Sequence, residues 1–169
     1  HHRFGDELPV ADLIVHPALP GSNYPFTGLC GAGVAFKLAW ALCQRHSGAQ
    51  KVLEPLRDFL LQAVGLAAIG TVADMVPLID ENRILVRNGL KTLHKHPPLG
   101  LRKLMELTKI SEKRELGAED IGFTLAPRLN AAGRLGQAQL GVELLVTEDE
   151  TRADALAAYI QVLNENRTK

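Results

Sequence analysis

The chain has 169 residues, of which 46% are hydrophobic and 22% charged, so its composition is that of a folded globular domain and excludes a disordered segment. Nineteen basic residues balance nineteen acidic ones, which excludes binding to a polyanion through a strong overall field and leaves only local clusters for that purpose. The two cysteines, Cys30 and Cys43, share one apolar stretch, so we expect a reducing, cytoplasmic setting with no disulfide framework. Neither a secretory signal nor an uninterrupted apolar run of about 18 residues is present, so we expect no membrane partner.

The first part of the chain predicts one strand followed by two helices. The run ADLIVHP (11–17) is short, apolar and ends at a proline, as a buried strand does when it leaves a sheet. A proline-rich loop over 17–26 precedes a helix over about 29–46 that is apolar on nearly all sides. An amphipathic helix begins near Leu56, and the β-branched residues, glycine and proline of IGTVADMVPL (69–78) predict its end and an irregular loop.

The second part of the chain predicts further helices. They are expected over 80–93, 101–108 and 118–126, then around Leu140–Leu145 and from Glu150 onward. Asp80 can cap the first of these, and Pro127 is expected to end the third, so that RLNAAGRLGQ (128–137) forms a glycine-containing loop. Thr147 and Glu150 have the spacing of a capping box for the last helix.

These elements predict an α/β fold weighted to helix, with one or two strands and about six or seven helices. Because a lone strand is not stable in water, we expect the chain to be part of a sheet whose other strands precede it. The last helix is still amphipathic at Lys169, which predicts more protein beyond it.

Asp74 is the one charged residue of IGTVADMVPL. A carboxylate in an apolar run is costly unless it is paired, hydrogen-bonded or bound to a metal ion. The alternative is a helix-terminal aspartate that accepts backbone N–H bonds, a common use of this residue. The residues alone leave both interpretations open.

The stretch PRLNAAGR combines groups that suit anion binding. Arg128 and Arg134 flank Asn130 and Gly133. Guanidinium groups bind phosphate through two hydrogen bonds, the start of a following helix adds partial positive charge, and a glycine lets a phosphate approach closely. The alternative is a solvated turn with ordinary surface arginines. No G-x-G-x-x-G or G-K-[ST] motif occurs, so neither a Rossmann fingerprint nor a P-loop is present.

Three histidines near the N-terminus also have two interpretations. His1 and His2 are compatible with the remains of an affinity tag and with the end of a metal-binding motif. His16, beside Pro17 at the end of the predicted strand, could face a cleft or be a structural histidine.

Taken in order, several stretches resemble the DHH phosphoesterase family, and within it the RecJ-type single-stranded-DNA exonucleases: HHRFGDELP, ADLIVHPALPGSNYPF, LCGAGVAFKLAWAL, IGTVADMVPLIDENRILVRNGL and APRLNAAGRLGQAQLGVELL. GTVADMVPL and PRLNAAGRL are the most specific of them, and the resemblance spans essentially the whole chain. It implies the later part of a DHH-type parallel-sheet catalytic domain over 1–150. Residues 151–169 would begin a connector helix toward a DHH-associated domain outside the chain.

The resemblance also implies roles for individual residues. His1 and Asp74 would be ligands of a divalent metal ion, Mn²⁺ or Mg²⁺, and His2 and Asp74 would be catalytic, which favours a native motif over a tag. The residues that would bind the DNA backbone are Arg128, Asn130, Gly133 and Arg134. Carboxylate oxygens and imidazole are suitable ligands for manganese.

The implied activity is a hydrolase that removes nucleotides from single-stranded DNA in the 5′→3′ direction, in DNA repair and recombination, with a single-stranded-DNA-binding protein as a further partner. We expect the chain to be inactive alone, because the family's earlier aspartate motifs and its second domain lie outside it. The alternatives are another DHH phosphodiesterase, acting on nanoRNA or a cyclic dinucleotide, and a non-catalytic DHH-like replication scaffold.

Overall fold

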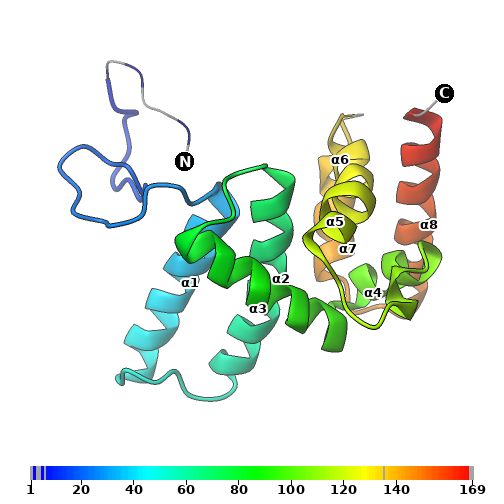
Figure 1. Cartoon of the computed structure of the whole chain (residues 1–169), viewed down its shortest axis with the longest axis horizontal. Coiled ribbons are helices and arrows are strands. Elements are labelled where there is room, and N and C mark those ends of the chain that lie inside the picture. The colour runs from blue at the N-terminus through cyan, green and yellow to red at the C-terminus, as the bar shows by residue number, and fades with distance from the viewer. Residues whose placement is uncertain (1, 3–4, 6, 135, 168–169) are drawn as a thin grey trace. The chain divides into compact units, whose positions relative to one another are not determined.

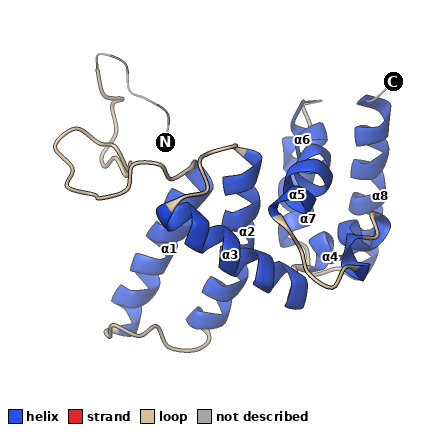
Figure 2. Ribbon diagram, viewed as in Figure 1, coloured by secondary structure: helices blue, strands red, loops and turns tan. Residues whose placement is uncertain are grey.

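The computed structural model of the chain describes residues 2, 5, 7–134 and 136–167, without the side chains of residues 134 and 167. Among these residues the regular secondary structure is helical, and no strand occurs (Figure 2). Two compact units divide the chain, His1–Asn88 and Gly89–Lys169.

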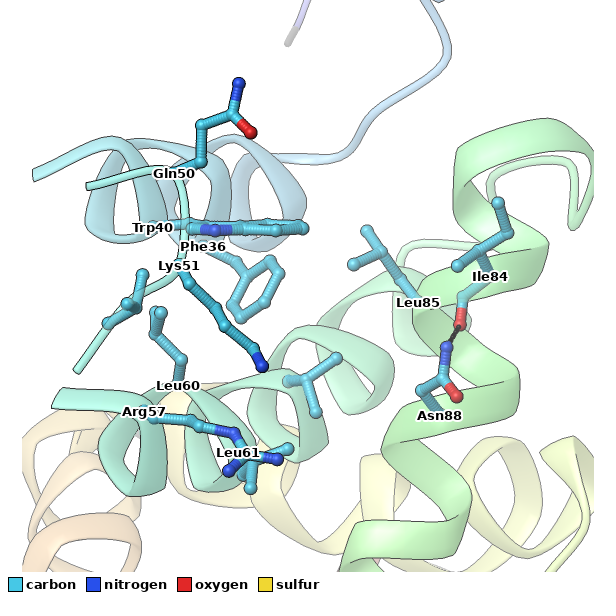
Figure 3. A pocket seen from close by; sticks show the side chains of 12 residues that line it. Phe36, Trp40, Gln50, Lys51, Arg57, Leu60, Leu61, Ile84, Leu85 and Asn88 are labelled. Carbon is cyan, nitrogen blue, oxygen red and sulfur yellow. Dashed lines mark hydrogen bonds between the residues drawn. The ribbon is translucent and has the colours of Figure 1, made fainter. Parts of the chain in front are cut away.

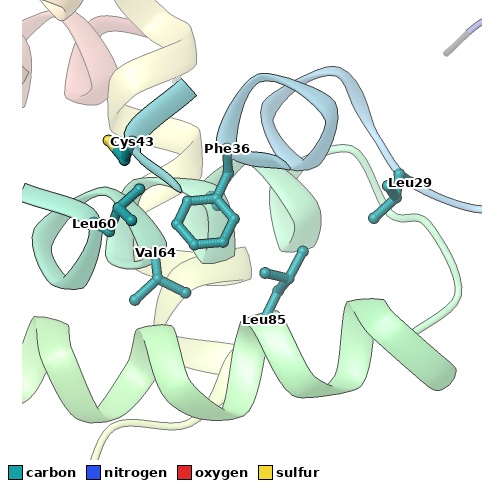
Figure 4. Close-up of a cluster of buried hydrophobic side chains, with 7 residues drawn as sticks. Leu29, Phe36, Cys43, Leu60, Val64 and Leu85 are labelled. Carbon is teal, nitrogen blue, oxygen red and sulfur yellow. The ribbon is translucent and has the colours of Figure 1, made fainter. Parts of the chain in front are cut away.

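The first unit is built from α1 (Gly31–Ser47), α2 (Leu56–Ala73) and the first half of α3 (Asp80–Lys95), after a long irregular N-terminal segment (Figure 1). α1 packs along α2. The core of the unit consists of buried apolar side chains from these helices and from the segment just before α1: Leu29, Phe36, Cys43, Leu60, Val64, Ala67 and Leu85 (Figure 4).

The start of α1 and the end of α2 are held closely together. Cys30 caps α1, because its Sγ accepts a hydrogen bond from the Gly33 N–H at 3.4 Å. Gly70 of α2 lies directly against Ala32, so that a Cβ on residue 70 would collide with the Ala32 methyl group. The absence of a side chain at Gly70 therefore sets how closely the two helices approach.

α2 continues beyond its predicted end and runs through Ala73. Ile69 and Thr71 are buried in this last turn, and the Thr71 hydroxyl donates to the Ala67 carbonyl at 2.7 Å. Packing therefore outweighs the weak helix propensity of the β-branched residues. By length and apolar composition α2 is, among the described helices, the one that could cross a membrane, but a helix packed in a protein core has the same composition.

The predicted strand over 11–17 is wrong for the described chain. This segment is irregular, and the large apolar side chains of Val10, Leu13 and Val15 are exposed. A strand needs a neighbour to satisfy its backbone N–H and C=O groups, and the described residues offer none. The described part of the chain is thus helical rather than α/β.

The second unit is a group of packed helices in which α8 contacts α4, α6 and α7. Its elements are the second half of α3, α4 (Leu99–Leu107), the 3₁₀ helix η1 (Ile110–Glu112), α5 (Ala118–Asp120), the π-helix η2 (Ile121–Leu125), α6 (Ala126–Arg134), α7 (Ala138–Val146) and α8 (Glu150–Arg167). Its largest fully buried apolar side chains are Leu93, Leu101, Leu104, Ile121, Leu125, Leu144 and Ile160.

Two details of the second unit differ from the sequence-based prediction. Pro127 does not end a helix: the π-helix η2 runs directly into α6, and residues 128–134 are helical rather than a loop. The N-cap of α8 is Asp149, whose Oδ1 accepts the Arg152 N–H at 2.8 Å, rather than Thr147.

Candidate functional site

Asp74 lies on the surface at the C-terminal end of α2. It is the C-cap residue, and its N–H donates to the Gly70 carbonyl at 3.0 Å. The carboxylate is therefore not buried in an apolar environment, and Asp74 is helix-terminal, as the second interpretation of the sequence requires. A negative charge is unfavourable at a helix C-terminus, where the helix dipole is also negative. Asp74 thus lies at a position whose potential attracts a cation.

Asn82 fixes the loop that follows Asp74. Its side chain is fully buried, and Nδ2 donates to the Gly28 carbonyl at 2.8 Å and to the Pro77 carbonyl at 3.0 Å. These two bonds tie the loop after α2 to the segment before α1. The sequence reasoning did not identify Asn82, because a single asparagine on a helix carries no signal of which distant carbonyls it will meet.

His16 connects the N-terminal segment to the loop that follows it. Its Nδ1 accepts the Ala18 N–H at 3.0 Å, and Nε2 lies 2.8 Å from the His2 carbonyl oxygen. This pattern assigns the neutral tautomer with the proton on Nε2, which donates to His2. His16 also lines a cavity of about 450 Å³, so both of its predicted roles are found together. His1, a predicted metal ligand, lies outside the described residues.

Tyr24, Lys37 and Glu81 form a polar cluster in the first unit. The Tyr24 hydroxyl donates to Glu81 Oε2 at 2.7 Å, and Lys37 Nζ lies 3.2 Å from the same oxygen. Burial raises the pKa of Tyr24, and the hydrogen bond to Glu81 raises it further. Burial lowers the pKa of Lys37, but the interactions of Lys37 with Tyr24 and Glu81 outweigh burial and raise this pKa above its ordinary value. Lys37 therefore stays cationic beside the cavity that it and His16 line. Sequence spacing could not reveal this cluster.

A second cavity, of about 380 Å³, lies among α1, α2 and α3 (Figure 3). Its wall is mostly apolar, with Phe36, Trp40 and Leu61 among its residues, and Lys51 and Arg57 contribute the cations. It contains none of the predicted site residues, so it is separate from the candidate site.

The described residues do not by themselves form a metal site. No three His, Cys, Asp or Glu side chains within them are grouped closely enough to hold a metal ion. The exposed Asp74 carboxylate is a hard oxygen donor of the kind that Mn²⁺ and Mg²⁺ prefer. In donor chemistry Asp74 fits such an ion, with further ligands needed from elsewhere.

Arg128 in the second unit is half-buried and bonded to two elements. Its Nε donates to Gln161 Oε1 of α8 at 2.6 Å, and Nη1 donates to the Thr124 carbonyl of η2 at 2.8 Å. Burial lowers the pKa of Arg128, the Glu165 carboxylate partly offsets this, and the guanidinium remains cationic. Its Nη2 donates to no residue of the described chain, which leaves a charged donor for an external acceptor.

The other predicted DNA-binding residues follow along α6. Asn130 and Gly133 are exposed, three positions apart and hence about one helical turn apart. Arg134 is the last residue of α6, and its side chain is not among those that the structure describes. The structure therefore brings these residues together on one helix, where the sequence predicted a loop.

Known proteins match both the sequence and the structure. No protein-family model matches the chain. The chain is 49% identical over 169 residues to the single-stranded-DNA-specific exonuclease RecJ of Bacillus subtilis (strain 168), a match to 100% of this chain and 20% of that protein. Among solved structures it resembles RecJ of Thermus thermophilus in complex with Mn²⁺, with a TM-score of 0.82 and 38% identity over 99% of this chain and 24% of that one. The complex of RecJ from the same organism with Mg²⁺ matches with a TM-score of 0.74 and 38% identity over 90% of this chain and 22% of that one.

The matched proteins define a class, nucleases, and the two solved structures among them hold divalent metal ions. Within that class the chain is homologous over its whole length to RecJ-type single-stranded-DNA-specific exonucleases, and the resemblance found in the sequence is confirmed. The chain spans about a fifth of the length of the Bacillus subtilis relative.

Proposed function

We propose that the chain is part of the catalytic domain of a metal-dependent exonuclease that hydrolyses single-stranded DNA in the 5′→3′ direction, in cytoplasmic DNA repair and recombination. The observation that carries this proposal is the exposed Asp74 carboxylate at the C-terminal end of α2, within a chain homologous to RecJ from end to end. Residues 1–150 would be the later part of the catalytic domain, and residues 151–169 the start of the connector helix.

Asp74, with His1, would hold Mn²⁺ or Mg²⁺ together with ligands from outside this chain. Two observations support Asp74 in this role: its carboxylate is exposed, and it lies at the negative end of the α2 dipole. A bound ion of this kind supplies an activated water and neutralises charge on a phosphodiester. His2 would act beside it, and the bond from His16 to the His2 carbonyl holds the backbone from which that side chain projects.

α6 would bind the DNA strand. Arg128 offers Nη2 to a phosphate, while its other bonds fix the plane of the guanidinium. Asn130 and Gly133 present an amide and an open stretch of backbone on the exposed face, and Arg134 adds a second cation at the end of the helix. Contacts of this kind position a strand without reading its sequence. A single-stranded-DNA-binding protein is proposed as a further partner.

The test is Asp74→Ala in the full-length protein that carries this sequence. We expect it to abolish Mn²⁺-dependent degradation of end-labelled single-stranded DNA and to remove the increase in melting temperature that Mn²⁺ gives the unaltered protein. Asp58→Ala, at another exposed aspartate of α2, is the matched control and should change neither measurement. Full activity in the Asp74 variant would refute the metal assignment.

The same assay separates the alternatives. Hydrolysis of dinucleotides or nanoRNA, with long single strands left intact, would support a different DHH phosphodiesterase. An unaltered full-length protein that binds DNA but hydrolyses none of these substrates would support the replication scaffold.

A further inference from the structure

An exposed aromatic side chain precedes the proposed DNA-binding residues of α6. Of the residues from 121 to 133, three are exposed: Phe123, Asn130 and Gly133. Two of these were identified from the sequence as DNA-binding residues. Phe123, in the π-helix η2, was not, and 81% of its surface is accessible.

These three are the exposed residues of one continuous helical stretch that joins η2 to α6. Other residues of the same stretch are at most 1% exposed: Ile121, Leu125, Ala131 and Ala132. Asn130 follows Phe123 by seven positions, the first three of which lie in the π-turn, and Gly133 follows Asn130 by about one turn of α6. The i+5 bond from the Ala126 N–H to the Ile121 carbonyl marks the π-turn between Phe123 and α6. A π-turn inserts one residue into a helix and is frequent at functional sites.

The length of this face suits a nucleic-acid strand. Seven residues of helix span about 10 Å, and stacked nucleotides rise by about 3.4 Å each, so the distance from Phe123 to Asn130 corresponds to about three stacked nucleotides. Every base has a π-face, so an exposed aromatic ring can stack on any base irrespective of sequence. Asn130 can hydrogen-bond to sugar, phosphate or base, and Gly133 has no side chain to obstruct the strand.

We propose that Phe123 is a base-stacking residue of this exonuclease, and that single-stranded DNA lies along the face formed by Phe123, Asn130 and Gly133. The inference rests on the proposed binding of single-stranded DNA and adds to it a contact with the bases. Single exposed apolar residues are common on protein surfaces. What distinguishes Phe123 is that it is exposed on the same helical stretch as two residues of the proposed strand-binding set.

The experiment measures equilibrium binding of the full-length protein to fluorescent oligothymidylate by anisotropy, without divalent ions so that no strand is cleaved. Phe123→Ala should weaken binding by about 5- to 150-fold, the usual loss for one stacked base. Phe123→Trp should retain the affinity, and Phe123→Leu, which keeps an apolar group but no π-face, should lose it. Phe59→Ala, at an exposed phenylalanine of α2, is the matched control and should bind as the unaltered protein does.

An abasic oligomer of equal length isolates the stacking contact. The unaltered protein and Phe123→Ala should bind it with equal affinity, because there is no base left to stack. Retained affinity for oligothymidylate in Phe123→Leu would overturn the inference. A lower melting temperature in both Phe123→Ala and Phe123→Leu would also overturn it, because it would show that another part of the protein packs on this ring. Failure of the unaltered protein to bind oligothymidylate would instead refute the proposed function on which the inference rests.

Discussion

Arg128 of α6 donates a hydrogen bond from Nε to Gln161 Oε1 of α8 over 2.6 Å, and the Gln161 amide in turn donates to Glu165 at 2.6 Å. The bond joins two helices that pack against each other in the second unit. A side chain proposed to bind DNA is therefore also part of the fold. The two roles predict different results for substitutions on either side of the bond.

Arg128→Ala should lower the free energy of unfolding by about 1–2 kcal/mol, because two hydrogen bonds from a charged donor are lost at a half-buried position. Urea unfolding measures this change. Gln161→Ala breaks the same interhelix bond but leaves the guanidinium in place, so it should reduce stability without a matching loss of affinity for single-stranded DNA. Equal affinities in the two variants would leave Arg128 with a structural role alone.

Most helices could be predicted from apolar periodicity, because each buries one side against its own unit. In α8, for example, Leu156, Ile160 and Leu163 have the helical spacing and are buried. The end of α2 could not be predicted, because packing at Ile69 outweighs the low helix propensity of the β-branched residues. The continuation of the helix through Pro127 could not be predicted either, because local propensity does not indicate the π-turn of η2 before it. The predicted strand failed for a different reason, since a short apolar run forms a strand only beside a neighbouring strand, and the described residues offer none.

The sequence proposed candidate residues where a short motif carries their chemistry, and missed residues that act through distant partners. Asp74 and the residues of PRLNAAGR were singled out by type and spacing, although their roles remain predictions. Asn82 and Lys37 act through partners 54 and 44 positions away, Gly28 and Glu81, which no local pattern indicates. Phe123 was missed because a single phenylalanine in an apolar stretch does not indicate whether its side chain is buried or exposed.

Gly70→Ala should destabilise the first unit and disturb the end of α2. The added methyl group would collide with Ala32 of α1, and overpacking of this kind costs roughly 1–3 kcal/mol. Because Asp74 follows one turn later, Mn²⁺-dependent activity of the full-length protein should fall as well. Ala32→Gly in the same protein removes the colliding methyl group, so the double variant should recover part of the stability, as a double-mutant cycle would measure. No recovery would show that the contact with Ala32 is not the cause.

Asp120→Asn should destabilise the second unit in a pH-dependent way. Burial opposes ionisation of Asp120, but the Gly117 N–H, at 2.9 Å, and Lys113 outweigh it and hold the pKa of this carboxyl below its ordinary value. A lowered pKa in the folded state stabilises the fold above the unfolded pKa, near 3.9, and this contribution is lost as the pH falls through the folded pKa.

At neutral pH the Asp120→Asn variant should therefore be about 1–3 kcal/mol less stable than the unaltered chain, and the difference should shrink below about pH 4. Urea unfolding across a pH series measures this. Glu119→Gln, at the exposed neighbouring position, serves as the control and should change little. A difference that stays constant down to pH 2 would exclude ionisation of Asp120 as its source.

Arg134→Ala should reduce the salt dependence of binding to single-stranded DNA. Each phosphate neutralised by a cation releases counterions, so the loss of one contact should change the slope of log K against log salt concentration by about 0.7 for a single strand. The affinity at low salt should fall by a similar factor for all sequences, because a phosphate contact does not read bases. Arg114→Ala, at an exposed arginine of the same unit, is the matched control and should leave the slope unchanged. If the two variants have the same slope as the unaltered protein, Arg134 is an ordinary surface arginine and the DNA path along α6 ends before it.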